Sequence, residues 1–366
     1  MIARSYFSTN KILKFALEEI YLNFKKDILI DDYDFVLFAI SPKYYPEDVK
    51  EDISKIFKNN FLAFNAIHSF SNNNVVSGVS AMFIKFEKNG NIDTFVCECK
   101  ERNKEKLLKY LLSHKNSLNI IVSTYNMDIA NFLEKIDLKD SVSLIGGIVS
   151  GEEIEGTYRG NLYFNHKIIE KGFAVLSFNN VEFSSSIATG YRPLGPSLKV
   201  RLAKENRVYL IDYSDASLVA KSLLKGLDNI KDLWNSPILI KRGEQFIPRT
   251  FKDIKENLYV EFFGNFKQNE EISLSFANEE LLLKEDRKRA AEVKNSLHNC
   301  DMIFDFSCIA RQYILKDKAD DELEIFSEII NAPLFGFFTF GEMINVCNNN
   351  VTLFNQTSLI AGVKEC

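Results

Sequence analysis

Two arginines and one glutamate carry side chains that could hold a small zwitterion. Arg192 lies in "GYRPLGP", Arg311 lies in "FSCIARQY", and Glu342 ends "FGFFTFGE". Arginine offers a planar fork to a carboxylate, and a glutamate accepts hydrogen bonds from an ammonium group. Asn355 and Thr357 in "FNQTS" add neutral donors and acceptors. If the fold brings these side chains together, they form a clamp for a small ligand.

Cys308 stands at the end of an expected buried strand, close to Arg311. A nearby guanidinium favours the thiolate, the form in which a cysteine acts as a nucleophile. The alternative is a buried, inert cysteine, and we favour it because histidine is the usual base for such a nucleophile. The sequence has four histidines, and none lies in a matching motif. We therefore expect a protein that is not an enzyme, with a cysteine enzyme using Cys308 as an alternative.

A pair of glycines, Gly146 and Gly147, lies inside the apolar strand "LIGGIVSG". Glycine weakens a strand, so a pair within one often marks a bulge or the close approach of another group. That group is either a ligand or a neighbouring helix, and the sequence leaves both readings open.

Composition and missing motifs exclude several functions. With 366 residues, of which 46% are apolar and 26% charged, the chain is globular and long enough for two or three compact units. A net charge of −5, with both signs interleaved, predicts no nucleic-acid partner. The sequence lacks a Walker A loop, a strand-to-helix GxGxxG, an HExxH and a GxSxG, and it has no long apolar run. We expect a cytoplasmic protein that does not insert into membranes.

The cysteines lack the spacing of a metal site. They are Cys97, Cys99, Cys300, Cys308, Cys347 and Cys366. Since none forms a CxxC pair, we expect no metal, no disulfide framework and no cofactor.

The apolar pattern predicts the elements that position these residues. Three times the chain passes through a strand, a helix, a second strand and a hairpin, with first strands at 34–41, 118–125 and 301–308. This indicates an internal repeat, although any α/β chain yields such echoes. Hairpins mixed with single crossovers predict an α/β fold with mixed parallel and antiparallel sheets and flanking helices. We expect an N-terminal helix within 1–30, a first domain over 31–190 and a second over 191–366.

The ordered motifs resemble the FIST family, the F-box and intracellular signal transduction domains. The resemblance spans about residues 30–363 and runs through "GGIVSGE", "GYRPLGPSLKV", "FSCIARQ", "PLFGFFTFGEM" and "LFNQTS". Two departures are Ala310 and Gln312, which stand where the family has glycines on either side of the arginine. The resemblance, together with the glycine pair above, places ligand-binding residues at Gly146, Gly147, Tyr191, Arg192, Gly195, Cys308, Arg311, Phe337, Glu342, Asn355 and Thr357.

The resemblance implies that a FIST-N part is followed by a FIST-C part. It also implies that the protein is a sensor without catalytic activity. Such a protein would bind a small-molecule ligand, such as an amino acid or small organic acid, and signal through a partner of kinase, cyclase or chemotaxis type. An alternative is a protein–protein interaction platform without a small ligand. A large exposed apolar patch would favour that alternative.

Overall fold

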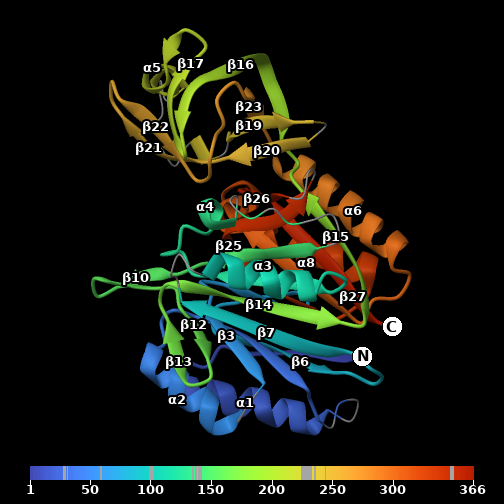
Figure 1. Cartoon of the computed structure of the whole chain (residues 1–366). Helices are drawn as coiled ribbons and strands as arrows, with labels where there is room; N and C mark the ends of the chain where they lie inside the picture. The colour runs from blue at the N-terminus through green and yellow to red at the C-terminus, as the bar shows by residue number, and fades with distance from the viewer. Residues whose placement is uncertain are drawn as a thin grey trace.

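Three units with the same strand order build the main body of the protein, and a small β-lobe is inserted into the third unit (Figure 1). The computed structural model describes residues 1–27, 30, 32–57, 60–98, 103–133, 136, 138, 142–223, 233–234, 236–243, 245–346 and 350–366. The fold is mixed α/β with mixed parallel and antiparallel sheets, as the sequence predicts.

The first unit forms most of a six-stranded sheet. Its strand order is β1-β6-β2-β3, in which β2 and β3 are parallel and the other pairs are antiparallel. Its elements are β1 (Ile2–Ser8), α1 (Leu13–Lys26), β2 (Phe35–Ile40), α2 (Pro46–Ile56), β3 (Phe61–Asn65), β4 (Ser69–Ser71), β5 (Asn74–Val76) and β6 (Val79–Lys85). The N-terminal segment therefore contains a strand ahead of the expected helix.

The second unit repeats this order in the larger sheet as β7-β14-β8-β9, again with one parallel pair, β8 and β9. Its elements are β7 (Asn91–Glu98), α3 (Asn103–Ser113), β8 (Leu118–Ser123), α4 (Ile129–Leu133), β9 (Ser143–Val149), β10 (Glu152–Ile154), β11 (Thr157–Arg159), β12 (Leu162–Phe164), β13 (Lys167–Ile169) and β14 (Gly172–Asn179). The β12–β13 hairpin leaves this unit and extends the first sheet through β3.

The third unit has the order β15-β27-β24-β25, with β24 and β25 parallel. Its elements are β15 (Val181–Ala188), α6 (Glu279–Ser296), β24 (Met302–Cys308), α7 (Gln312–Leu315), α8 (Ala319–Ile330), β25 (Leu334–Val346), β26 (Asn350–Phe354) and β27 (Ser358–Glu365). Antiparallel pairing of β25 with β9 joins the second and third units in one sheet. The predicted internal repeat is confirmed by this shared topology.

The β-lobe, residues 192–276, separates the first strand of the third unit from its first helix. Its strands and helix are β16 (Arg192–Lys204), β17 (Arg207–Ile211), β18 (Ser214–Asp215), α5 (Ala216–Leu223), β19 (Ile238–Arg242), β20 (Gln245–Arg249), β21 (Phe251–Lys255), β22 (Tyr259–Phe262) and β23 (Glu271–Phe276). The chain enters along β16 and leaves along β23, and Arg192 pairs with Phe276. The lobe is thus attached to the body by two hydrogen-bonded strands.

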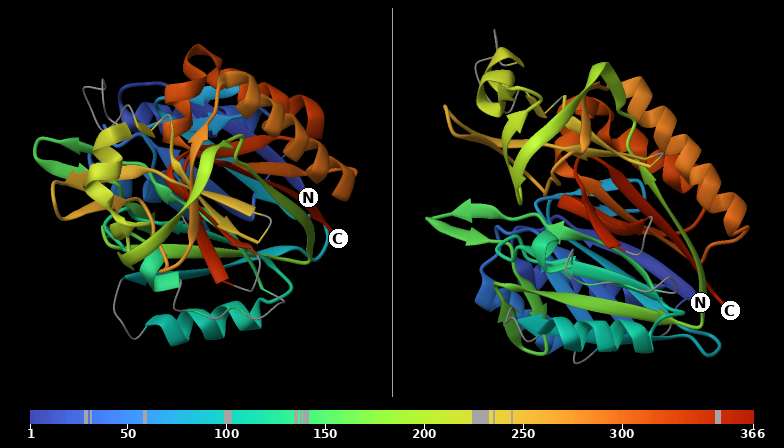
Figure 2. Two further views of the ribbon diagram at one scale, coloured as in Figure 1. Left: turned by 90° about the horizontal axis from the view of Figure 1, so that it is seen from above. Right: turned by 45° about the horizontal axis from the view of Figure 1, so that its top comes forward.

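The body is a sandwich of two sheets with helices on both outer faces. Side chains of both sheets fill the central layer, where the rings of Phe64 and Phe337 lie 4.6 Å apart. Helices α1 and α2 cover the first sheet, while α3, α4, α6 and α8 cover the larger one (Figures 1 and 2). The termini lie side by side, away from the β-lobe, and the Met1 ammonium is 2.8 Å from the Glu365 carboxylate.

Local sequence accounts for where several helices begin. Helix α2 starts at Pro46, whose fixed φ suits the first helical position, and two acidic residues follow in its first turn. Helix α6 begins after Asn278, whose side chain accepts a 2.9 Å hydrogen bond from the Leu281 amide. Helix α6 holds Glu285 and Asp286, two of the charged residues considered next.

Candidate functional site

A pocket of about 300 Å³ lies where the β-lobe meets the body, and we call it the aromatic pocket. The body contributes residues that follow the carboxyl ends of β3, β8 and β24, which are Ile67, Tyr125 and Ile309. The remaining lining residues are Trp234, Thr250, Phe263, Cys308, Ala310, Tyr313, Phe340 and Asn355. In open α/β sheets, ligands bind at the carboxyl ends of strands, so this is the position expected of a binding site.

Aromatic rings form the walls of the pocket and meet edge to face. Trp234 makes interplanar angles of 80° with Phe263 and 88° with Tyr313. On the body side, Tyr125 and Phe340 meet at 76° with centroids 5.4 Å apart. The Trp234 indole donates a 2.9 Å hydrogen bond to the Phe251 carbonyl, which orients its ring. These contacts give the pocket well-positioned apolar walls.

Cys308 lies at the floor, where β24 ends. Burial raises the pKa of its thiol well above the ordinary value, and the nearby Glu342 carboxyl acts in the same direction. The Cys308 amide donates a 2.8 Å hydrogen bond to the Thr357 carbonyl, which ties the floor to the next strand of the sheet. A thiol in this environment stays protonated at neutral pH and is a poor nucleophile.

Glu342 lies behind this floor and is fully buried. It accepts hydrogen bonds from the Thr339 hydroxyl, from the Thr357 hydroxyl at 2.7 Å and from the Thr357 amide at 3.2 Å. Burial raises the pKa of Glu342 to about 8, against the opposing effect of these donors. Three of the predicted site residues, Cys308, Glu342 and Thr357, are therefore brought together, and Asn355 lies beside them in the lining.

Arg311 is turned away from the aromatic pocket into a buried ion-pair network. Its guanidinium is 2.7 Å from the carboxylate of Asp286 on α6 and 2.9 Å from that of Glu322 on α8. Asp305 of β24 is buried nearby and accepts a 2.9 Å hydrogen bond from the Ser358 hydroxyl. Burial raises the pKa of both Asp286 and Asp305 well above the usual range. The network fastens α6 and α8 to the end of β24.

Arg192 lies elsewhere, at the base of the β-lobe, and its side chain is 54% exposed. Its nearest acid is Glu285, at 3.6 Å. It shares a separate pocket of about 360 Å³ with Tyr191, whose ring is buried and whose hydroxyl donates to the Gln356 side chain. Burial raises the pKa of the Tyr191 hydroxyl. Arg192, Arg311 and Glu342 thus bind different partners and do not form one clamp.

Gly146, Gly147, Gly195 and Phe337 were also predicted as site residues, and none of them lines the aromatic pocket. A side chain at Gly146 would place its Cβ 1.8 Å from the Ile121 carbonyl oxygen, and one at Gly147 would lie 2.5 Å from the Thr339 methyl. The group that approaches this pair is therefore the neighbouring strand on each side. Gly195 is in an exposed bend of β16 with φ +74°, and Phe337 is buried in the central layer.

The five aromatic residues of the pocket walls are not among the predicted site residues. Trp234 is the single tryptophan of the chain, and Tyr125 lies two residues after the end of β8; these are the two signals that could have indicated the walls. Phe263, Tyr313 and Phe340 carry no signal of this kind, because the chain has 31 phenylalanines and most of its aromatic residues fill cores. Only their arrangement in three dimensions separates them from core residues.

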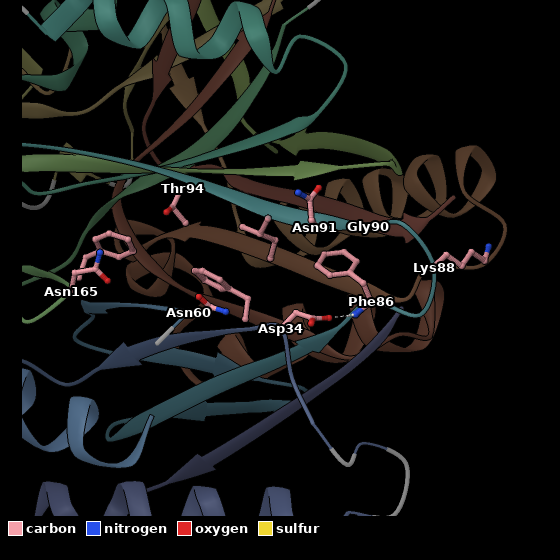
Figure 3. Close-up of a pocket in the computed structure, with 11 residues that line it drawn as sticks. Asp34, Asn60, Phe86, Lys88, Gly90, Asn91, Thr94 and Asn165 are labelled. Atoms are coloured by element: carbon pink, nitrogen blue, oxygen red, sulfur yellow. Dashed lines mark hydrogen bonds between the residues drawn. The ribbon is translucent and has the colours of Figure 1, made fainter. Parts of the chain in front are cut away.

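A larger pocket, of about 650 Å³, opens between the two sheets beside β7 (Figure 3). Asp34, Asn60, Lys88, Asn91 and Thr94 give it a mainly polar lining. The Asp34 carboxylate accepts a 2.7 Å hydrogen bond from the Phe86 amide. None of the predicted site residues lines this pocket, so it is not our candidate site.

No group of three metal-ligating side chains occurs among the residues that the structure describes. Cys300, Cys308 and Cys366 are free thiols, Cys97 is buried, and Cys99 and Cys347 lie outside the described residues. In the same part of the chain, no helix is both long and apolar enough to cross a membrane.

Comparison with known proteins gives two family matches and one relative. A family model described as the FIST N domain matches residues 34–214, and one described as the FIST C domain matches residues 214–345. An uncharacterized protein of Aquifex aeolicus (strain VF5) is 29% identical over 253 residues, which are 64% of this chain and 93% of that protein. The two family matches meet inside the β-lobe, at β18.

Proposed function

We propose, from the premise that the chain belongs to the FIST family, that it is a cytoplasmic, non-catalytic sensor that binds a small molecule in the aromatic pocket. FIST domains are associated with signal transduction, so a bound ligand would be reported to a partner protein of the kinase, cyclase or chemotaxis type. The pocket's position between lobe and body carries this proposal.

The walls of the pocket come from segments far apart in the chain. Trp234, Thr250 and Phe263 belong to the β-lobe, whereas Tyr125 and Phe340 belong to the body. A ligand that contacts both sides favours the arrangement in which they are close, and its differential affinity shifts the population toward that arrangement. The orientation of the lobe would then depend on ligand occupancy.

The chemistry of the floor supports a binding role over catalysis. Cys308 has a raised pKa, and Glu342 is bonded to two threonines. His68 is not in the lining, and burial lowers the pKa of its ring. A nucleophile needs a base within hydrogen-bond reach, and the residues described around the pocket supply none to the Cys308 thiol.

The exposed apolar side chains of the β-lobe support the proposal of a signalling partner. The lobe carries half of the large apolar side chains that are exposed in the described part of the chain: Leu194, Leu202, Leu210, Tyr213, Leu218, Leu258 and Phe276. Leu202 and Leu210 pair across neighbouring strands. Exposed apolar side chains mark an interaction surface where they lie next to each other, as Leu202 and Leu210 do. They also favour the second candidate function, an interaction platform that needs no small ligand.

Thermal unfolding in the presence of small molecules tests the choice between these functions. A ligand present at 100 times its Kd stabilises the folded state by about 2.7 kcal/mol, which raises the melting temperature by several degrees. The shift should disappear in Ala310→Leu, which fills the pocket, and remain in Arg192→Ala. If a broad set of amino acids, organic acids and neutral compounds gives no shift that depends on Ala310, the platform function is the better account.

A further inference from the structure

We infer that the ligand of the aromatic pocket is a neutral, mainly apolar molecule with a ring or branched body and one uncharged polar group. This inference rests on the proposed function and narrows its ligand class. It differs from the small zwitterion that the arginines and the glutamate predicted, and from the amino acid or small organic acid that the family resemblance implies.

The first reason is the chemistry of the walls. Five of the lining residues are aromatic, and those lining residues that the structure describes include no lysine, arginine, aspartate or glutamate. Thr250 and Asn355 supply the neutral polar groups, and the Thr250 amide lies 3.5 Å from the Asn355 side-chain oxygen. Apolar walls with a few neutral polar groups bind a ligand of matching polarity.

The second reason is that the nearby charged groups are already bonded inside the protein. Arg311 pairs with Asp286 and Glu322 through its Nε and Nη2 atoms, and it is not one of the lining residues. Arg249, the residue before Thr250, is fully buried and donates to the carbonyls of Leu353 and Asn265. The described contacts of Glu342 are with the two threonines.

Lys252 lies near one wall of the pocket but is not one of its lining residues. Its ammonium lies 6.0 Å from the centroid of the Phe263 ring and 2.8 Å from the Glu261 carboxylate, which neutralises it. A charged ligand would therefore lose its hydration in the pocket without gaining an opposite charge. A buried charge without a partner is strongly unfavourable, whereas a neutral hydroxyl needs only one hydrogen bond.

The single tryptophan makes this inference testable with matched compounds. Trp234 lines the pocket, so its fluorescence, excited at a wavelength that phenyl rings do not absorb, reports binding directly. The probes are benzyl alcohol, benzylamine, phenylacetate and phenylalanine, which share a phenyl ring and differ in charge. We expect benzyl alcohol to bind at least tenfold more tightly than each of the other three.

A reversed preference at the same pocket would overturn the inference and leave the proposed function standing. In that outcome, phenylalanine, phenylacetate or benzylamine binds more tightly than benzyl alcohol, and this binding is lost in Ala310→Leu. If none of the four probes changes Trp234 fluorescence and the wider thermal screen gives no shift, the proposed function itself fails. Ile67→Phe fills the pocket from a different lining residue and replaces Ala310→Leu if that variant does not fold.

An isosteric substitution of Asn355 changes the relative affinity of two probes, and a variant that merely failed to fold would not produce such a change. Asn355→Asp keeps the shape and the acceptor oxygen and adds a negative charge to the lining. We expect the ratio of benzylamine affinity to benzyl alcohol affinity to rise at least tenfold in this variant. An unchanged ratio would show that ligands do not contact this part of the pocket and would overturn the assignment of Asn355 to the binding surface.

Discussion

Glu342→Gln should make the folded protein less sensitive to rising pH. The pKa of Glu342 is about 8 in the folded protein and near 4.5 in an exposed chain, because burial disfavours the carboxylate. Between these two pH values the folded state binds one more proton than the unfolded state. The stability associated with this group is therefore fully present below pH 4.5 and is lost as the pH rises toward 8.

The size of the effect follows from the two pKa values. Each pH unit in this window costs about 1.4 kcal/mol per proton, so the wild-type protein should lose about 2.5 kcal/mol more than the variant between pH 5.5 and 7.5. Glutamine stays neutral and can still accept from the Thr357 hydroxyl. Above about pH 8.5 the two curves should run parallel, since both states of the wild type are then ionised.

Urea unfolding followed by far-UV circular dichroism at several pH values measures this difference. Asp286 and Asp305 also have raised pKa values, and subtracting the variant from the wild type removes their contribution. Glu328→Gln, on the exposed side of α8, is the matched control and should leave the slope unchanged. Parallel curves for wild type and Glu342→Gln from pH 5.5 to 7.5 would refute a raised pKa at Glu342.

Three further predictions concern buried contacts of the body. Arg311→Ala leaves two carboxylates buried without their partner and should lower the free energy of unfolding by about 3–5 kcal/mol. Arg192→Ala should lower it by less than about 1 kcal/mol, because that side chain is exposed. Similar losses for the two variants in chemical denaturation would contradict this assignment. At pH 7, iodoacetamide should modify exposed Cys366 well before buried Cys308, as peptide mass spectrometry would show, and equal rates would contradict a protonated, enclosed thiol. Gly146→Ala should lower the melting temperature strongly, because the added Cβ meets a backbone oxygen; an unchanged melting temperature would argue against that close contact.

The repeated body could be predicted from sequence because its strands and helices have strong local patterns. The strands around 35–40, 118–123 and 302–308 are mainly apolar and fully buried, which is typical of parallel strands inside a protein. The strand Ile2–Ser8 was missed because it is an edge strand that is only partly buried. The separate sheet of the β-lobe was also missed, because its strand pairing depends on contacts between distant segments.

The site was less predictable because side-chain type does not reveal a partner. Cys308 and Asn355 were predicted and do line the pocket. Arg311 has the chemistry of a ligand clamp, yet its partners on α6 and α8 lie before and after it in the chain and are visible only in the fold. The aromatic residues around Trp234 were not predicted, since phenylalanine and tyrosine at strand ends are usually part of a core.

The two-strand attachment of the β-lobe has a consequence for how the protein folds. Closing a loop becomes more costly as the loop lengthens, so bringing β15 and β24 into one sheet across residues 189–301 is entropically unfavourable in an unfolded chain. Once β16 and β23 have paired, the chain between Arg192 and Phe276 no longer contributes to that loop. Only residues 189–191 and 277–301 then remain to be closed. An early-folding lobe would therefore shorten the connection that the third unit must span.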